Sequence, residues 1–585
     1  MSSNADIAAI FEQMAALLEL TGADKFRVNA HARAARAIEA CAEPLVDLAD
    51  DLKALEAIEG IGAKSAKKIA EYAETGEIKE HRELLAKVPS GLLDVLAVPG
   101  LGPKTVKLLW EEKGVEGIDD LKRIIEDGSI ADVPRMGAKT IANIADAISF
   151  AERSAGRLQL GLAVPIAEMI CERLRAVKGA GSVEYAGSAR RGRETVGDLD
   201  ILASGKDEAA LHDAFTSMPE VEKVLASGES KSSVRMQVGK HLIQADLRVV
   251  GAAHHGAALM YFTGSKEFNV RLRERALKKG MTLNEYGLYP EDQEKAPPQH
   301  RGVKPIASKT EEAIFEALGV AYVPPELREE GTGWEKWKQT PELIEVKDIR
   351  AELHAHTTAS DGAMSIEELV EAAKERGFHT IAVTDHSRSS AIAGGLSVER
   401  LMEHIEAVRE VDAKVKGITV LAGSEVDILA DGTLDYEDKV LKKLDVVVAS
   451  PHASLRQESG VATERLLKAI ANPFVHILGH PTGRLIGERE ALSPDIGKLV
   501  AAAAEHHVAL EINSHWRRLD LRDVHVRAAM SGGALVAIDC DVHRAEQFEN
   551  VRYGIATARR GGVAPERCIN TWTAKKLHAW LKAKR

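Results

Sequence analysis

Hydrophobic and polar residues follow three different rhythms along the chain. In residues 1–150, apolar positions recur every three or four residues and β-branched runs are few, which predicts amphipathic helices. Between about residues 181 and 250, short apolar stretches separated by Gly, Asp and Ser predict strands. Beyond residue 350, seven apolar strand candidates alternate with helical patterns. This alternation is typical of a parallel α/β barrel rather than a sandwich.

The changes in the hydrophobic pattern divide the chain into domains. Domains of about 100–200 residues predict roughly three to five of them in 585 residues. A polar, proline-bearing stretch before the barrel predicts a linker. We expect a multidomain protein of α+β and α/β class. Its expected segments are 1–88 (helical), 89–150 (helical), 151–250 (mixed β-sheet), 251–320 (smaller mixed subdomain), 321–345 (linker) and 346–585 (distorted seven-stranded barrel).

Composition narrows the class of protein further. Hydrophobic residues make up 45% of the chain and charged residues 28%, as in globular proteins. We find neither a run of about 18 apolar residues nor the basic start of a signal peptide. The four cysteines have no paired spacing, which is typical of reduced thiols. We expect a cytoplasmic protein without membrane contact and, because no coiled-coil seam occurs, a monomer.

The net charge of −12 limits how a nucleic acid can be bound. Residues 1–150 carry 18 Lys and Arg against 26 Asp and Glu, so no broad basic surface is expected there. Two Gly-x-Gly turns in this region each precede a predicted helix and a lysine. Free N–H groups and the positive end of a helix dipole suit a phosphate oxygen. The six candidate DNA-binding residues are Gly60, Gly62, Lys64, Gly100, Gly102 and Lys104.

A single turn of this kind is as easily an ordinary helix–turn–helix connection with a glycine cap. Two copies with matched apolar flanks favour a grip on the DNA backbone that does not depend on base sequence. A third copy around Met136-Gly137 lacks its first glycine, and we expect it to be structural.

Three aspartates in the predicted sheet indicate metal-dependent phosphoryl transfer. Asp198 and Asp200 lie two positions apart on one strand and project from the same face, and Asp246 lies on another strand. Converging carboxylates repel one another unless cations lie between them. Two Mg²⁺ or Mn²⁺ ions about 4 Å apart relieve this repulsion and suit an in-line displacement. A lone Asp-x-Asp is more commonly a solvent-facing strand, so the surroundings decide.

Histidines are concentrated in the barrel segment, with 14 of the 21 beyond residue 350. Any one of them is readily explained as a buried, hydrogen-bonded residue. However, nine His, Asp and Glu residues lie at or after strand ends, which meet at one face of a parallel barrel. Such a set predicts two or three ions of Mn²⁺, Zn²⁺ or Fe²⁺. The nine candidate ligands are His354, His356, Asp361, His386, Glu425, His452, His480, Asp541 and His543.

The first 320 residues resemble a known family. GSARRGRETVGDLDIL, YFTGSKEFNVRLR and Asn284-Glu285-Tyr286 resemble motifs of the family X DNA polymerases, and the Gly-x-Gly turns resemble helix–hairpin–helix motifs. The resemblance implies a palm at 151–250, a thumb at 251–320, DNA and dNTP substrates, and Asp198, Asp200 and Asp246 as catalytic metal ligands. Its implied substrate-binding residues are Ser188 and Arg191 (triphosphate), Tyr261 and Phe262 (sugar), Asn269 (incoming base), Arg273 (template), and Gly197, Gly264, Ser265 and Glu285.

A lysine in the first Gly-x-Gly segment carries a further expectation. A member of the family removes 5′-deoxyribose phosphate through a Schiff-base lysine, and Lys68 occupies the matching position. Lysine suits this chemistry where neighbouring cations lower its pKa. The earlier stretch FRVNAHARAAR departs from the family at His31, where a tyrosine is usual. Lys68 is therefore either this nucleophile or a side chain that faces solvent or a phosphate.

The segment at roughly 346–585 resembles the polymerase-and-histidinol-phosphatase (PHP) domain family in its motifs HAHTTASDG, TDHS, GSEVDI, SPH, GHPTGR and DVH. This resemblance implies a phosphoesterase cleft with three metal ions. Glu352 and Val542 differ from the residues common in the family, but neither change removes a ligand. Glu511 and Asn513 lie at a strand end and stay open as supporting or substrate contacts.

Together these features predict an enzyme of base-excision-type DNA repair. We expect the palm to add dNTPs to a primer 3′-OH at gapped or nicked double-stranded DNA. We expect the barrel to act on 3′ ends as a 3′-5′ exonuclease and 3′-phosphatase, and also to cleave at abasic sites. Two alternatives stay open: a hydrolase whose polymerase part only tethers DNA, and a scaffold without catalysis.

Overall fold

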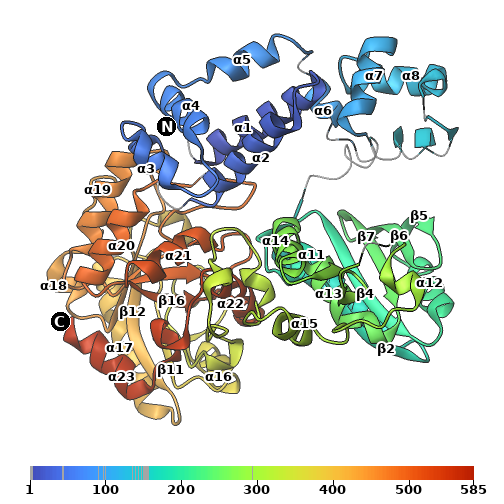
Figure 1. The fold of residues 1–585 in the computed structure, drawn as a ribbon. Coiled ribbons are helices and arrows are strands. Elements are labelled where there is room, and N and C mark those ends of the chain that lie inside the picture. The colour runs from blue at the N-terminus through green and yellow to red at the C-terminus, as the bar shows by residue number, and fades with distance from the viewer. Residues whose placement is uncertain are drawn as a thin grey trace.

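A computed structural model of the protein describes residues 4–584, except for 42–44, 90, 97, 99–100, 135, 139, 143, 146–147, 149–156, 293, 295 and 490. N-terminal helices are followed by a five-stranded sheet, a small mixed subdomain and a seven-stranded barrel. In Figure 1 the helices lie above, the barrel on the left and the five-stranded sheet on the right. In the part of the chain that the structure describes, no helix has the length and hydropathy of a membrane span.

The N-terminal region is helical, as its hydrophobic pattern predicts. Asp24 caps α2 (Lys25–Glu39), accepting hydrogen bonds from the N–H groups of Phe26 and Arg27 at 3.0 Å. Gly76 ends α4 (Ala63–Thr75) with a φ of 74°, which glycine adopts without strain. The other helices are α1 (Asn4–Leu20), α3 (Leu52–Ala57), α5 (Lys79–Leu85), α6 (Leu92–Leu96), α7 (Pro103–Lys113) and α8 (Ile118–Glu126).

The five-stranded sheet has the order β2-β4-β7-β6-β5. Its pair β4 (Asp198–Gly205) and β7 (His241–Val250) is parallel, and the other pairs are antiparallel. The edge strand β5 (Val221–Ser227) is absent from the sequence prediction, because its residues are mostly exposed and lack an apolar alternation. The other elements are β1 (Leu158–Gln159), α10 (Leu160–Arg175), β2 (Ala180–Tyr185), α11 (Gly187–Arg190), β3 (Thr195–Val196), α12 (Glu208–Thr216) and β6 (Lys231–Val238).

The segment at 321–345, predicted as a linker, packs against the small mixed subdomain. Trp334 is 2% exposed and packs in the subdomain core, 5.0 Å from the Phe268 ring. Arg328 is fully buried and pairs with Glu311 at 2.6 Å. Residues 321–345 are thus a packed strap between two domains. The elements of the subdomain are α13 (His255–Thr263), α14 (Lys266–Leu277), β8 (Met281–Asn284), β9 (Gly287–Pro290) and α15 (Glu311–Ala317).

The barrel consists of seven parallel strands that pair in chain order. A parallel bridge between Ala355 and Val542 joins the ends of the first and last strands, so the barrel is nearly closed. The fold class predicted from the sequence is confirmed. The strands are β10 (Ala351–Glu352), β11 (Thr380–Val383), β12 (Thr419–Asp427), β13 (Val446–Ser450), β14 (Ile477–Leu478), β15 (Ala509–Asn513) and β16 (Leu535–Asp539).

Strand residues alternate between two separate hydrophobic cores. Outward residues such as Val447 and Val536 join the core beneath the surrounding helices, and inward residues such as Val448 and Ala537 fill the interior. The last helix closes the amino end, where the His476 ring bonds the Leu581 carbonyl at 3.1 Å. The barrel helices are α16 (Ile366–Glu375), α17 (Val398–Lys414), α18 (Asp438–Leu441), α19 (Ser459–Ile470), α20 (Ile496–Glu505), α21 (Asp523–Ser531), α22 (Val551–Arg560) and α23 (Ala574–Ala583).

Candidate functional sites

The three aspartates of the five-stranded sheet lie together on its parallel strand pair. Asp200 on β4 stands directly opposite Asp246 on β7, and Asp198 lies two residues earlier on β4. Lys231 on β6 places its Nζ 2.6 Å from Asp246 Oδ2. The turn before β4 passes close to these groups, because a Cβ on Gly187 would lie 2.1 Å from Asp200 Oδ2. Only glycine fits at that position.

Electrostatics make this carboxylate group costly without a cation. Burial, together with the charges of Asp198 and Asp246, raises the pKa of Asp200 to about 7. Burial and the charge of Asp246 also raise the pKa of Asp198. Such shifts measure how strongly the site disfavours three negative charges. A divalent cation among the carboxylates removes this penalty, so their chemistry fits Mg²⁺ or Mn²⁺.

Two predicted triphosphate contacts lie in the turn that follows β2. Ser188 is half-buried in α11, and Arg191 follows at the end of that helix. The Arg191 guanidinium donates from Nε to Glu329 at 2.9 Å and from Nη1 to the Thr263 carbonyl. A Cβ on Gly264 would lie 3.2 Å from the same guanidinium, so Gly264 and Arg191 are neighbours.

Four further predicted substrate residues make contacts that fix their side chains. The Tyr261 and Phe262 rings meet edge to face at 5.2 Å, and Arg248 covers the Phe262 ring at 4.3 Å. Asn269 donates its amide to the Tyr261 carbonyl at 2.7 Å. Ser265 caps α14, accepting from the Phe268 N–H at 3.3 Å.

Three other predicted substrate residues lie at the edges of this region. Gly197 is exposed immediately before Asp198. Arg273 is an exposed residue of α14. Glu285 lies in the turn between β8 and β9.

The glycine turns of the N-terminal region present open helix starts. Gly62 and Gly102 are the N-cap residues of α4 and α7, without a side-chain cap and with no atom within 4 Å of an added Cβ. Lys64 and Lys104 are exposed in the first turns of these helices. Gly60 has a φ of 102° and lies against Ala37. Gly100 falls outside the described residues.

Lys68 lies in a basic pocket but is held by an acid. Its Nζ is 2.9 Å from Glu80, which also accepts from Arg27 at 2.7 Å. Burial by itself raises the pKa of Glu80, but hydrogen bonds and charge from Lys68 and Arg27 bring it below its ordinary value. Lys64 and Lys67 line the same pocket. The structure therefore shows Lys68 in an ion pair rather than free.

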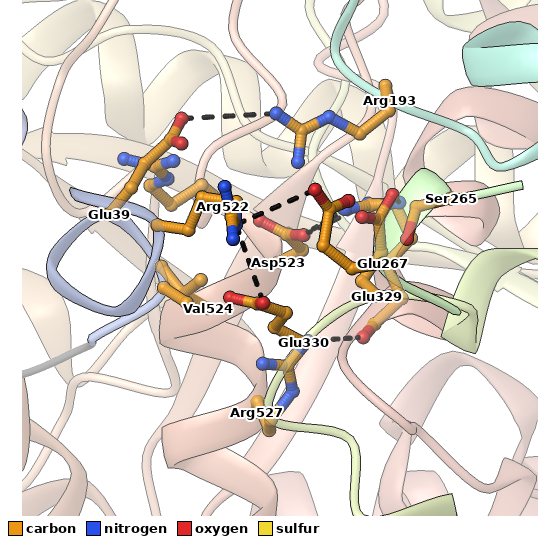
Figure 2. A pocket seen from close by; sticks show the side chains of 13 residues that line it. Glu39, Arg193, Ser265, Glu267, Glu329, Glu330, Arg522, Asp523, Val524 and Arg527 are labelled. Atoms are coloured by element: carbon orange, nitrogen blue, oxygen red, sulfur yellow. Dashed lines mark hydrogen bonds and ion pairs between the residues drawn. The ribbon is translucent and has the colours of Figure 1, made fainter. Parts of the chain in front are cut away.

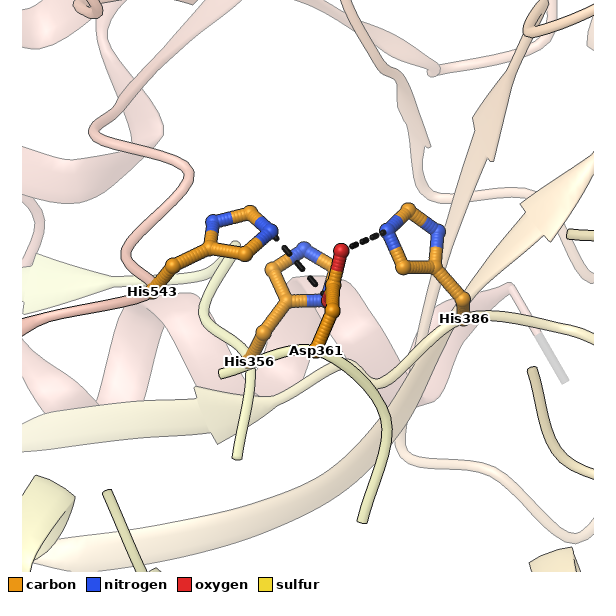
Figure 3. Close-up of side chains that lie close together, drawn as sticks. All are labelled: His356, Asp361, His386 and His543. Carbon is orange, nitrogen blue, oxygen red and sulfur yellow. Dashed lines mark ion pairs between the residues drawn. The ribbon is translucent and has the colours of Figure 1, made fainter. Parts of the chain in front are cut away.

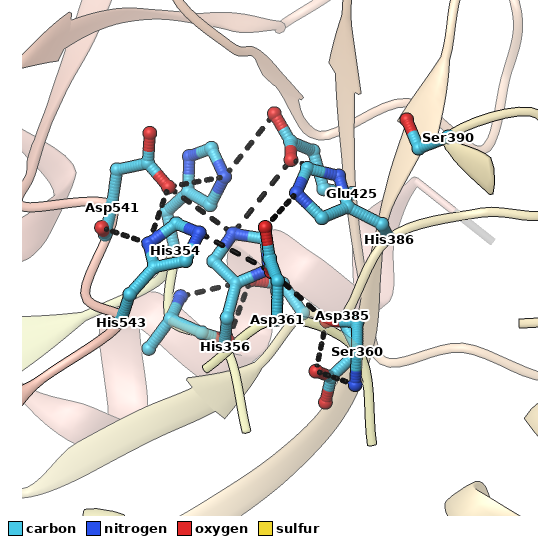
Figure 4. Close-up of polar contacts among 12 residues, drawn as sticks. His354, His356, Ser360, Asp361, Asp385, His386, Ser390, Glu425, Asp541 and His543 are labelled. Atoms are coloured by element: carbon cyan, nitrogen blue, oxygen red, sulfur yellow. Dashed lines mark hydrogen bonds and ion pairs between the residues drawn. The ribbon is translucent and has the colours of Figure 1, made fainter. Parts of the chain in front are cut away.

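The nine predicted barrel residues converge at the carboxyl end of the strands, around Glu425. Figure 4 labels seven of them, all except His452 and His480. Glu425 is fully buried on β12. Its Oε1 lies 3.3 Å from His354 Nε2, 3.2 Å from His452 Nε2 and 2.9 Å from His480 Nε2. Its Oε2 lies 2.9 Å from His386 Nδ1. One carboxylate thus joins imidazoles from four strand ends.

The nine side chains form four overlapping groups whose ligand atoms lie within 4.8 Å of one another. One group surrounds Asp361, which His386 and His543 approach at 3.6 and 3.3 Å, with His356 between them (Figure 3). Asp361 is 35% exposed and marks the open side of the site. The full groups are His356-Asp361-His386-His543, His354-Glu425-His480, His354-His356-Asp541 and His386-Glu425-His452.

Several of these buried atoms have no hydrogen-bond partner among the described residues, including both Glu425 oxygens and His356 and His480 ring nitrogens. Burial lowers the pKa of His356 to about 4 and that of His480 to about 3, so both rings are neutral near pH 7. Neutral imidazoles and carboxylates with free lone pairs fit divalent metal ions. The overlapping groups leave room for more than one ion.

Around these residues lies a layer of acids, of which the sequence pointed only to Glu511, as a supporting or substrate contact. Asp427 accepts a short hydrogen bond from His452 Nδ1, and Glu511 contacts His354 Nδ1 at 2.6 Å. Asp385 accepts a hydrogen bond from Ser360 (Figure 4) and another from His404 Nε2 at 2.8 Å. Such partners fix the orientation of ligand rings. For Asp427 the local signal was its position two residues beyond Glu425 on the same strand face.

Four segments of the chain match known families. A helix–hairpin–helix domain matches residues 2–78, and a SAM-like helix–hairpin–helix tandem matches residues 92–149. The DNA polymerase beta thumb matches residues 258–329. The PHP domain matches residues 352–515.

Individual relatives match either nearly the whole chain or about two fifths of it. A probable phosphatase of Thermoanaerobacter sp. (strain X514) is 28% identical over 243 residues, 40% of this chain and 94% of its own length. A probable phosphatase of Escherichia coli (strain K12 / DH10B) is 29% identical over 240 residues, 39% of this chain and 92% of its own.

The DNA polymerase/3′-5′ exonuclease PolX of Bacillus subtilis (strain 168) is 35% identical over 577 residues, covering 99% of both chains. This similarity contradicts both alternative hypotheses, a hydrolase whose polymerase part only tethers DNA and a scaffold without catalysis. The similarity extends along nearly the whole chain, and the thumb, helix–hairpin–helix and PHP matches agree with it. The chain therefore belongs to the PolX family of DNA polymerases with 3′-5′ exonuclease activity.

Proposed function

We propose that the protein fills short gaps during base-excision-type DNA repair, the palm extending a primer 3′ end and the barrel preparing it. The observation that carries this proposal is the presence of two chemically different sites on separate domains. Three aspartates gather on the palm sheet, and nine His, Asp and Glu residues gather in the barrel. One chain can therefore both remove and add nucleotides at the same kind of end.

In the palm, we assign metal binding to Asp198, Asp200 and Asp246. Two Mg²⁺ or Mn²⁺ ions bound there supply positive charge to the triphosphate and the attacking 3′ oxygen. Ser188 and Arg191 bind the phosphate oxygens, since their turn passes directly beside Asp200. Until ions bind, Lys231 compensates the charge of Asp246.

The thumb residues then orient the nucleotide. Tyr261 and Phe262 form a fixed aromatic pair on which the sugar rests, and the amide of Asn269 is held beside it by the Tyr261 carbonyl. We assign Gly197, Gly264, Ser265 and Glu285 to the walls of the nucleotide site, and Arg273 to the template.

In the barrel, we assign two or three Mn²⁺, Zn²⁺ or Fe²⁺ ions to the nine clustered residues. Ions held there would polarise a phosphoester and stabilise the charge on its leaving oxygen. The open side at Asp361 and His543 admits a 3′ end, and Glu511 and Asp427 hold the rings of His354 and His452. The shorter relatives, which are named as probable phosphatases, support a 3′-phosphatase activity beside the exonuclease. We extend the proposal to cleavage at abasic sites.

The N-terminal helices serve to hold the DNA in this proposal. The uncapped starts of α4 and α7, with Gly62, Gly102, Lys64 and Lys104, suit backbone phosphates on either side of a gap. The domain limits 1–88, 89–150, 151–250, 251–320 and 346–585, joined by the strap at 321–345, follow this division of roles.

The two sites are expected to be separable by substitution. Asp198→Ala should reduce primer extension on one-nucleotide-gapped DNA by at least about 100-fold, because losing several kcal/mol of charge stabilisation has this effect. It should leave 3′ shortening without dNTPs intact. Glu425→Ala should have the opposite pattern, measured on the same labelled primer with Mn²⁺. Loss of both activities in either folded variant would contradict the assignment.

Asp200 predicts a pH-dependent stability of the metal-free protein. Its pKa of about 7, against an ordinary 3.8, means that the folded state holds this proton more tightly. Raising the pH from 5 to 8 therefore destabilises the fold through this group. In EDTA, Asp200→Asn should raise the melting temperature at pH 8 by about 2–4 °C, and by less at pH 5. Asp213→Asn, at an exposed position of α12, is the control, and an equal gain from both variants would refute the prediction.

The acid behind His452 predicts a change in metal affinity. Asp427→Asn should weaken binding of Mn²⁺ or Zn²⁺ to the barrel about 10–100-fold, because it removes the carboxylate that orients the ring. Asp412→Asn is the matched control, since Asp412 caps the opposite end of the same strand through the Val420 N–H at 2.7 Å. Metal titration followed by calorimetry gives the affinity. Equal affinities in the two variants would exclude the orienting role.

Lys68 is the proposed lyase nucleophile, restrained by Glu80. Borohydride should trap the wild-type protein on 5′-deoxyribose phosphate DNA, and Lys68→Ala should abolish the trapped product. Glu80→Gln should increase trapping severalfold, because it frees the amine from its ion pair. Lys67→Ala, at the exposed neighbouring position, serves as control. Undiminished trapping by Lys68→Ala would remove this residue as the nucleophile.

A further inference from the structure

The palm turn that carries the proposed triphosphate contacts rests on the barrel. A Cβ on Gly192 would lie 3.0 Å from the Ala556 Cβ of α22. At the end of the same helix, Arg560 donates to the Arg191 carbonyl at 2.8 Å. Two residues after Gly192, Glu194 pairs with the barrel's Arg484 at 2.8 Å. Residues 191–194 are therefore held by the barrel at several points.

A single carboxylate extends this support to the Arg191 side chain. Glu329, in the strap between thumb and barrel, accepts from Arg191 Nε at 2.9 Å and from Arg560 Nη1 at 3.2 Å through the same oxygen. Burial by itself raises the pKa of Glu329, but Arg560 and Arg191 bring it below its ordinary value. Glu329 is thus an anion shared by two arginines from different domains.

Arg560 is itself held rigidly in place. Its side chain is 4% exposed, and it donates to Asp523 from Nε at 3.0 Å and from Nη2 at 2.6 Å. Glu329 and Asp523 face the small cavity between the N-terminal helices, palm, thumb and barrel that Figure 2 shows. Arg560 therefore places both the backbone and, through Glu329, the guanidinium of Arg191.

A flexible arginine loses conformational entropy when it binds phosphate, and holding it beforehand reduces that cost. We propose that Arg560 of the PHP barrel is a positioning residue for the dNTP site, acting through Glu329 and the Arg191 carbonyl. The barrel thereby sets the affinity of the polymerase for dNTPs independently of its own nuclease chemistry. This inference rests on the proposed role of Arg191 in triphosphate binding.

The test measures KM for dNTP, kcat and exonuclease rate in the full-length protein. Arg560→Ala should raise KM about tenfold, the effect of one lost charge-assisted hydrogen bond, with a smaller change in kcat and unaltered shortening of single-stranded DNA. Arg559→Ala is the matched control. Arg559 lies on the same helix as Arg560 and pairs with Glu326 at 2.7 Å, but this pair does not contact residues 191–194. Equal KM values in the two variants would overturn the proposal.

A second variant guards against a folding defect in Arg560→Ala. Glu329→Gln changes no residue of the barrel and should also raise KM. A lower KM would mean that Glu329 holds Arg191 away from the nucleotide, and it would overturn the proposal. Combining Arg560→Ala with Arg191→Ala should add little to Arg191→Ala alone. If Arg191→Ala leaves KM unchanged, the proposed triphosphate role is wrong. If it raises KM while Arg560→Ala and Glu329→Gln match the control, only the positioning role is wrong.

Discussion

The burial of Glu425 among imidazoles is the interaction on which the barrel site depends. A fully buried carboxylate is costly unless positive charge or hydrogen bonds compensate it. Burial by itself raises the pKa of Glu425, but His452, His354 and His386 hold it well below its ordinary value. The compensation is supplied by protonated rings or by metal ions competing for the same lone pairs. The site is therefore built to exchange protons for divalent cations.

The same constraint governs the palm with different ligands. Three carboxylates gather there, and the positive charges of Lys231, Arg157 and Arg248 compensate only part of their repulsion. Oxygen ligands alone favour hard ions such as Mg²⁺, whereas imidazoles with carboxylates favour Mn²⁺, Zn²⁺ or Fe²⁺. One chain can thus carry two metal-dependent activities with different ligand chemistry.

The barrel and the polymerase part are joined by ion pairs and hydrogen bonds. Arg552 pairs with Glu168 at 3.0 Å, Arg484 with Glu194 at 2.8 Å, and Gln159 donates to the Ile486 carbonyl at 2.7 Å. These contacts hold the palm against barrel elements that follow His480 along the chain. In an enzyme that both trims and extends a DNA end, such contacts keep the two sites at a fixed distance from each other.

Much of this protein was determined by the sequence alone. The seven barrel strands and the nine clustered residues follow from local pattern, because parallel strands bring their carboxyl ends to one face whatever the helices between them do. The three palm aspartates follow from strand periodicity and the resemblance of their motifs. These features depend on neighbours close in sequence.

Other features were decided only by the tertiary structure. Strand β5 carries too few buried residues to show a pattern, and it forms because β6 offers an edge. The pairing of Lys68 with Glu80, of His404 with Asp385, and of Arg560 with Glu329 joins residues 12 to 231 positions apart. Such pairs depend on how whole elements pack, and no local pattern of hydrophobic and polar residues encodes which distant charge a buried side chain meets.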